Sequence, residues 1–368
     1  MKKIILAALT LIAGFVIMQS CKKSGADSGS NNNSFDRKGL LSNVSTNIIL
    51  PAYTSFQTSV NTFNAAIVAF NAAPDATKLT AAQNAFIALY KQWQWTSLYD
   101  FGPASQANFR VNINTFPTDV TQINANIASG TYNPNLLANL AAKGLPALDY
   151  LLFGVGADNN AILVQYTTDS QAANRKTYLA TLTTEVKTRT DAIVSAWNGS
   201  YKATFLSADG TDVGSSLGQM VNQLVYDEEI LKNFEIGIPA GVQSMGTTYP
   251  TKVEAYYSKI SLQLALQHLQ AMQNLYLGKD GLGLDDYVAK VNAKYSDGRL
   301  LNDAIKAQFV IAQTKLQALS DPLSDNITTN NVAVVAAYTE LQKLTVMLKT
   351  DMTSSLGILI TFVDNDGD

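Results

Sequence analysis

Apolar side chains recur along most of this chain at alternating spacings of three and four residues. Such a spacing places them on one face of an α-helix. The resulting stripes run through residues 56–70, 79–93, 179–197, 217–225, 262–276, 305–319 and 334–348. Strand-like alternation is scarce, and loops rich in Gly, Pro, Asn and Asp separate the stripes. The pattern predicts an all-α fold built from antiparallel, up-down helical bundles.

The strongest interruption between long helical patterns is the Gly- and Asp-rich segment 206–214. It divides the folded part into residues 37–205 and 206–368, each with room for about four helices. We therefore expect two tandem bundles packed together. A helix runs into Gly102-Pro103 in the first half and into Gly237 and Pro239 in the second, and this echo leaves a duplication open.

The first residues form a pattern typical of a bacterial lipoprotein signal. Lys2 and Lys3 precede an apolar stretch over residues 4–18, which is too short to span a bilayer comfortably, and a short step leads to Cys21. Cys21 is the single cysteine of the chain and has polar neighbours, which favours lipidation over a buried, inert thiol. We predict a cleaved signal over 1–20 and a flexible tether over 21–36. We therefore expect the protein to be located in the cell envelope, and we favour the periplasmic side of the outer membrane. The lipid would make the membrane a binding partner.

Composition narrows the functional classes. The chain is 47% hydrophobic and 15% charged, and loss of Lys2 and Lys3 leaves 24 basic against 29 acidic residues. Nucleic-acid binding requires clustered positive charge, so this class is excluded. No second segment has the length and apolarity of a transmembrane helix.

The most distinctive candidate for chemistry is the segment 144–154, which has glycines at both ends. Pro146 suits the first turn of a helix, and Asp149 lies among large apolar residues. A short acid in such surroundings either points to solvent or caps a helix, which helix statistics favour, or occupies a polar pocket between helices.

This segment, together with residues 99–103 (YDFGP) and 116–119 (FPTD), resembles the imelysin-like proteins, also classed as peptidase family M75. The resemblance covers nearly all of the chain after the tether. It implies an all-α fold of two helical-bundle halves and a role in bacterial iron uptake. The family hallmark is Gly-x-His-x-x-Glu, whose imidazole and carboxylate share one helix face and could share a metal ion.

The chain departs from that hallmark at both chemical positions. Gly144 matches the glycine, but Pro146 replaces the histidine and Asp149 replaces the glutamate. Proline has no ligand atom in its side chain, so the His-Glu pair cannot form, and Asp149 alone is carried over as a site position. The only histidine, His268, shares a helix face with apolar residues, which favours a core or interface histidine over a metal ligand.

Other charged residues are weaker candidates for a functional site. Glu228 continues the stripe of residues 217–225, so we expect it to face inward and to approach Asp149 in a central cleft, whereas its neighbours Asp227 and Glu229 are expected to be solvated. Arg110 and Asp119 are expected to form a structural ion pair. The acidic end 364–368 lacks the spacing of a calcium loop and is expected to be exposed.

Three functions remain. The favoured one is a non-catalytic envelope protein of iron uptake that binds an iron species or an envelope transport protein, since oxygen ligands such as Asp149, Glu228 and tyrosines suit ferric iron. The second is a metallopeptidase of the M75 type, which would need a metal site without the motif histidine. The third is a structural lipoprotein with a protein partner. No cofactor is indicated apart from iron as a candidate.

Overall fold

The computed structural model describes residues 34–362. The predicted signal, Cys21, most of the tether and the acidic end 364–368 lie outside the described residues. Residues 35–362 lie in one compact unit. Its first residues are tied down, since Phe35 stacks on Tyr287 with ring centroids 4.5 Å apart, and Asp36 accepts a hydrogen bond from the amide of Gly39 at the start of the first helix.

The predicted all-α fold is confirmed. No strand occurs between residues 34 and 362, where pairing is limited to an isolated bridge between Lys294 and Leu300. The helices before the predicted break are α1 (Arg37–Val44), α2 (Leu50–Ala72), α3 (Ala76–Gln94), α4 (Pro103–Gln106), α5 (Phe109–Ile113), α6 (Val120–Ser129), α7 (Gly144–Asp149), α8 (Asn159–Thr167), α9 (Ala172–Ala196) and α10 (Lys202–Ser207). Those after it are α11 (Ser216–Glu229), α12 (Ser261–Tyr276), α13 (Leu284–Val291), α14 (Leu301–Gln317), α15 (Leu323–Thr329), α16 (Asn331–Val346) and α17 (Thr353–Leu356).

Shorter helical turns join these elements. The π-helical segments are Ser45–Ile49, Tyr150–Gly154, Trp197–Tyr201, Ile230–Gly237 and Met347–Met352, and the 3-10 segments are Ser97–Tyr99, Leu137–Ala142 and Pro250–Lys252. Within residues 34–362, ten α-helices lie before the predicted break and seven lie after it, more than the predicted four or so in each half, because many of them are short. None of the helices described is both long and apolar enough to cross a membrane.

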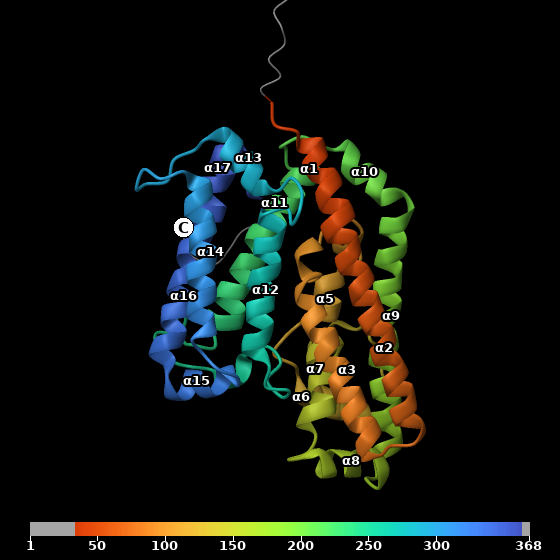
Figure 1. The fold of residues 1–368 in the computed structure, drawn as a ribbon. Helices are drawn as coiled ribbons and strands as arrows, with labels where there is room; N and C mark the ends of the chain where they lie inside the picture. Colours follow the sequence, from red (N-terminus) through yellow and green to blue (C-terminus); the bar gives the residue numbers. More distant parts are fainter. Residues whose placement is uncertain (1–33, 363–368) are drawn as a thin grey trace, which may run out of the picture. The chain divides into compact units, whose positions relative to one another are not determined.

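The predicted apolar stripes are buried in the structure, apart from Leu266 of the 262–276 stripe, which is partly buried. In α2, for example, Phe56, Phe63 and Phe70 are fully buried. α2 packs against both α3 and α9, while α14 packs against both α12 and α16, so long helices lie side by side in two groups (Figure 1). The assignment of these groups to two bundles divided at residue 205 stays a prediction.

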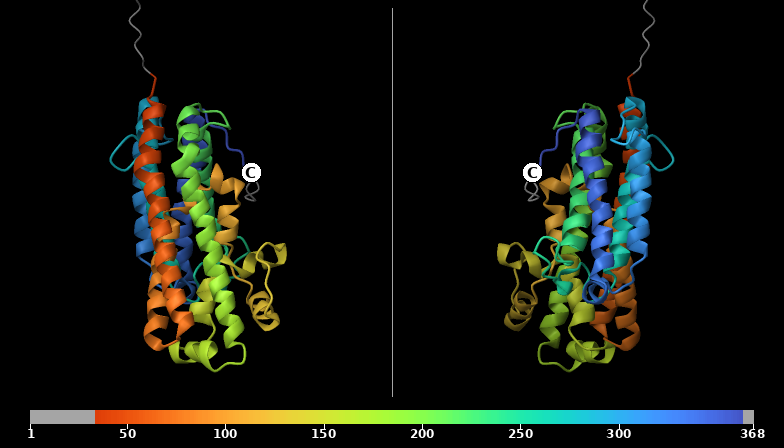
Figure 2. Two further views of the ribbon diagram at one scale, coloured as in Figure 1. Left: turned by 90° about the vertical axis from the view of Figure 1, so that its right-hand side faces the viewer. Right: turned by 90° about the vertical axis from the view of Figure 1, so that its left-hand side faces the viewer.

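Contacts between the two groups position the candidate site. α12 packs against α3, and α11 packs against the 3-10 turn Ser97–Tyr99 that follows α3. The shorter elements around α6 lie beside the long helices (Figure 2). Polar side chains on α11 and α12 therefore face polar side chains from the first part of the chain.

Candidate functional site

Three consecutive acidic residues at the end of α11 are buried. Asp227 and Glu228 are 0% exposed and Glu229 is 4% exposed. The prediction for Glu228 is confirmed in this respect, but the expectation that Asp227 and Glu229 are solvated is wrong. α11 contacts α12, α16 and the turn Ser97–Tyr99, so positions off its apolar stripe are covered as well.

His268 on α12 lies between two carboxylates. Its Nε2 is 2.9 Å from Oδ1 of Asp227, and its Nδ1 is 2.7 Å from Oε1 of Glu235. A ring nitrogen facing an ionised carboxylate must donate a proton, so the imidazole is held as the doubly protonated cation. Burial by itself lowers the pKa of His268, but the attraction of Glu235 and Asp227 outweighs it and raises this pKa to about 10. The prediction of a core histidine is confirmed.

Arg110, from α5, completes the charge pairing of Asp227. Its Nη2 donates to both Asp227 oxygens, at 2.9 and 2.7 Å, and to the carbonyl of Ser97 at 2.5 Å. The predicted pair with Asp119 is wrong, because Asp119 instead accepts a hydrogen bond from the amide of Gln122 and caps α6. Burial raises the pKa of Asp227, but Arg110 and His268 outweigh it and lower the pKa below its ordinary value.

Glu254 is a further buried acid beside this network, which the sequence reasoning missed. It is 1% exposed and accepts hydrogen bonds from Gln94, at 3.1 and 3.2 Å, and from Asn114, at 2.6 Å. Burial, together with repulsion from Glu235, raises its pKa to about 8. Glu254 lies in an irregular loop where no helical period applies, so no sequence signal marks it.

Asp149 of the motif segment fixes the backbone of a distant loop by accepting hydrogen bonds from two of its amides. Its Oδ2 accepts the amide of Tyr257 at 2.9 Å, and its Oδ1 accepts the amide of Ser258 at 3.0 Å. The side chain is 1% exposed, so it caps backbone, as the favoured interpretation allowed, but is not solvated. Burial raises its pKa to about 6, against the lowering effect of the hydrogen bonds from Ser258 and Tyr257.

The start of α7 explains the other motif positions. Gly144 has φ of +70°, and a Cβ atom there would lie 2.2 Å from the carbonyl oxygen of Ile113, so both backbone conformation and space require glycine. Pro146 is buried in the first turn, where a missing amide hydrogen costs no helical bond. The motif segment is therefore built to pack α7 closely against the end of α5.

Glu228 has surroundings different from those of Asp149. Its Oε2 accepts a hydrogen bond from the hydroxyl of Thr345 on α16 at 2.5 Å, and its Oε1 is buried without a hydrogen-bond partner. Burial raises its pKa to about 8. None of its described hydrogen bonds involves Asp149 or the 257–258 segment, and a common cleft for the two acids stays a prediction.

These contacts do not fit the metal site that the hallmark implies. Pro146 supplies no ligand atom, both oxygens of Asp149 accept backbone amides, and both nitrogens of His268 face carboxylates. Within residues 34–362, no three side chains of His, Cys, Asp or Glu are grouped so as to hold a metal ion. The buried network around Asp227 and His268 can keep charged groups fixed in the protein interior. It can also link the two groups of helices.

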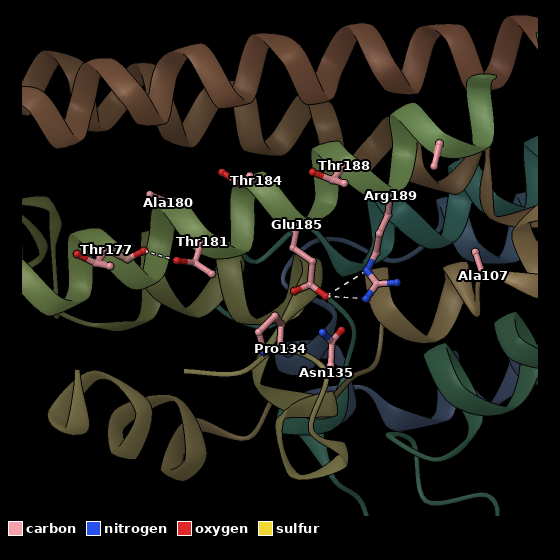
Figure 3. A pocket seen from close by; sticks show the side chains of 11 residues that line it. Ala107, Pro134, Asn135, Thr177, Ala180, Thr181, Thr184, Glu185, Thr188 and Arg189 are labelled. Carbon is pink, nitrogen blue, oxygen red and sulfur yellow. Dashed lines mark hydrogen bonds and ion pairs between the residues drawn. The ribbon is translucent and has the colours of Figure 1, made fainter. Parts of the chain in front are cut away.

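An open groove, separate from the buried network, lies along α9. Its floor is formed by small side chains, including Thr177, Thr181 and Thr188, and Pro134 and Asn135 face them (Figure 3). Glu185 within it is already paired, accepting from Arg189 at 3.0 Å and from Lys143 at 3.2 Å. We assign this groove no ligand.

Comparison with known proteins identifies the family. The imelysin profile, peptidase family M75, matches residues 49–348. The chain belongs to the imelysin family.

Individual relatives agree with this membership. The imelysin-family chain is 22% identical over 308 residues to iron-regulated protein A of Synechococcus elongatus, covering 80% of each chain. A crystal structure of a protein assigned as an iron-regulated protein A precursor, from Parabacteroides distasonis, superposes with a TM-score of 0.72 at 18% identity, covering 90% of this chain and 98% of that one. An imelysin-like protein from Psychrobacter arcticum superposes with a TM-score of 0.68 at 19% identity, covering 89% and 97%.

Loss of the Asp149 anchor is expected to destabilise the protein. In Asp149→Ala, two amides lose their acceptors, which costs about 2 kcal/mol of unfolding free energy, whereas Asp149→Asn retains one acceptor and costs less. Urea unfolding followed by circular dichroism measures both. Asp119→Ala, which removes an ordinary helix cap, is the control, with an expected loss of about 1 kcal/mol. Equal stability of Asp149→Ala and the wild type would contradict the anchoring role.

Proposed function

We propose that this protein is a lipid-anchored component of the cell envelope that serves iron acquisition by binding, without catalysing a reaction. The observation that carries the non-catalytic part is the use of Asp149 as a backbone anchor beside Pro146, where family members have a His-Glu pair. Catalytic zinc sites usually have three protein ligands and an open position, and the contacts of Asp149 and His268 leave neither side chain available for such a site.

Family membership and a named relative support the role in iron acquisition. The chain belongs to the imelysin family, and a relative over most of its length is named iron-regulated protein A. In this account iron is cargo, either as an iron species or carried by an envelope transport protein, and is not a resident cofactor. Lipidation at Cys21, which the sequence pattern predicts, would hold the protein at the membrane, with the periplasmic side of the outer membrane favoured.

Growth of the native host under iron limitation tests the iron role. Deletion of the gene is expected to slow growth when iron is chelated and to have no effect when iron is added back. The wild-type chain should restore growth, whereas Cys21→Ser should restore it less because the lipid anchor is lost. Equal growth of the deletion strain and its parent at all iron concentrations would contradict the iron role.

A hydrolysis assay tests the absence of catalysis. The full chain, incubated with a denatured protein substrate, is expected to give the same background with and without a metal chelator. Cleavage that disappears with chelator and returns with zinc would favour a metallopeptidase and contradict the binding role.

A further inference from the structure

The junction between α9 and α10 exposes the single Asn-Gly pair of the chain, Asn198-Gly199. α9 ends at Ala196, and the π-helical segment Trp197–Tyr201 leads into α10 (Figure 1). Within that segment Gly199 has φ of −83° and ψ of −123°, so its backbone is not helical. The regular helical backbone is therefore interrupted directly after Asn198.

Neither residue of this pair is covered by the rest of the protein. Asn198 and Gly199 are both exposed, and within residues 34–362 the side-chain amide of Asn198 has no hydrogen-bond partner. A Cβ atom added to Gly199 would meet no other part of the protein within 4 Å. The Asn198 side chain can therefore turn toward the backbone of Gly199 without breaking a hydrogen bond, and glycine has no side chain to block the approach.

The aromatic residues on either side of the exposed pair are packed. Trp197 is 0% exposed, and its ring centroid lies 4.8 Å from that of Tyr201 and 5.4 Å from that of Phe205. The phenol of Tyr201 lies so close to Gly102 that a Cβ atom there would collide with it. The exposed backbone thus connects two rings that are fixed in position, and a longer connection would have to displace one of them.

An accessible Asn-Gly pair can cyclise without an enzyme. After hydroxide removes the amide proton of Gly199, its backbone nitrogen attacks Cγ of Asn198, which lies within reach in the same chain. The N–Cγ bond forms and the Cγ–Nδ2 bond breaks, and the amide leaves as ammonia with a proton from water. Water then opens the five-membered imide at either carbonyl, which gives aspartate or isoaspartate. No group is oxidised or reduced.

We propose that Asn198 is a modification site, where deamidation replaces a neutral amide by a carboxylate and, in the isoaspartate product, lengthens the backbone by one carbon. The new negative charge follows the C-terminal end of α9, where the helix dipole disfavours it. The added carbon lies between Trp197 and Tyr201 and disturbs the contact of their rings. This inference is independent of the proposed iron role.

Ageing of the unaltered protein tests the proposal. The full chain in detergent micelles is kept at pH 8.5 and 37 °C, and its peptides are analysed over time by mass spectrometry with electron-transfer fragmentation, which distinguishes isoaspartate from aspartate. We expect Asn198 to gain about 1 Da at least about tenfold faster than any other asparagine between residues 35 and 362. No gain at Asn198, or a rate there no higher than at the others, would overturn the proposal.

An exposed Asp-Gly pair provides an internal control. Asp297-Gly298 has the same glycine, but Nε of Arg299 donates to the Asp297 carboxylate at 2.7 Å, and this hydrogen bond lowers the pKa of Asp297. An ionised carboxylate resists attack by the backbone nitrogen, so Asp297 should remain aspartate while Asn198 reacts. Isoaspartate forming at Asp297 as fast as at Asn198 would contradict the role of the free amide.

Two variants separate the chemistry from its structural effect. Asn198→Gln retains an amide but would require a six-membered ring, so the mass gain at this position should be at least about tenfold slower. Asn198→Asp supplies the charge without the added backbone carbon. Its tryptophan fluorescence should resemble that of fresh wild type, whereas wild type aged to isoaspartate should differ. Rapid mass gain in Asn198→Gln, or unchanged fluorescence of protein shown to contain isoaspartate, would overturn the corresponding part of the proposal.

Discussion

Replacing Asp227 by alanine is expected to lower the unfolding free energy by about 3–5 kcal/mol, the range for removing one member of a buried ion pair. The reason is that His268 and Arg110 would keep their positive charges in a buried place after losing the carboxylate they share. His268 is 1% exposed, so water cannot replace the lost partner without a rearrangement. Urea unfolding of the variant and the wild type at neutral pH measures the difference.

Two further variants show whether the loss comes from the pairing. Asp100→Ala removes a partly exposed acid whose Oδ2 is 3.7 Å from Nε of Arg110, and it should cost less than about 1 kcal/mol. The double variant Asp227→Ala/His268→Ala should be more stable than the sum of the single losses predicts, because one stranded charge is removed. A loss below about 1 kcal/mol for Asp227→Ala would contradict an ionised, buried network.

Stability is expected to fall as the pH rises from about 5 to 9. The folded protein retains protons on Glu228 and Glu254, whose pKa values burial raises from 4.5 to about 8. Their contribution is complete below pH 4.5 and is lost as the pH rises through about 8. His268 acts in the same direction, since its pKa is raised from 6.5 to about 10. Each group lowers the unfolding free energy by about 1.4 kcal/mol per pH unit within its window.

Urea unfolding at several pH values measures this slope. Glu228→Gln replaces the protonated carboxyl by an amide that does not titrate, so its decline between pH 4.5 and 8 should be shallower by about 1.4 kcal/mol per pH unit. Glu340→Gln, at an acid that is more exposed and whose pKa is lowered, is the control and should not flatten the decline. Stability that is constant or rises over this range would contradict the buried, protonated acids.

The helices could be predicted because they depend on local periodicity. The stripe of residues 262–276 predicts α12 within a residue or two, and it also places His268 in the core. Gly144 and Pro146 could be identified as special from the sequence, because glycine and proline have strong backbone preferences. The close approach of Gly144 to the backbone of Ile113 depends on the tertiary structure.

The buried charges could not be paired from the sequence. Asp227 lies 41 residues from His268 and 117 from Arg110, and no periodic pattern links such positions. The change from α- to π-helix at Ile230 also shifts the face on which Glu235 lies, so the 3.6-residue period no longer applies. The available signal was the run of three acids at 227–229 at the end of an otherwise uncharged helix, since unpaired buried acids are costly.

The central claim is that the chain's only histidine is a buried imidazolium held by two carboxylates and is unavailable to a metal ion. Nitrogen NMR of the full chain, labelled with ¹⁵N at histidine and prepared without a histidine tag, tests it directly because a single imidazole contributes. We expect both ring nitrogens to be protonated at pH 7.5, to remain so between about pH 6 and 9, and to be unaffected by zinc or iron. A neutral imidazole that titrates near 6.5, or ring signals that shift on metal addition, would contradict the account.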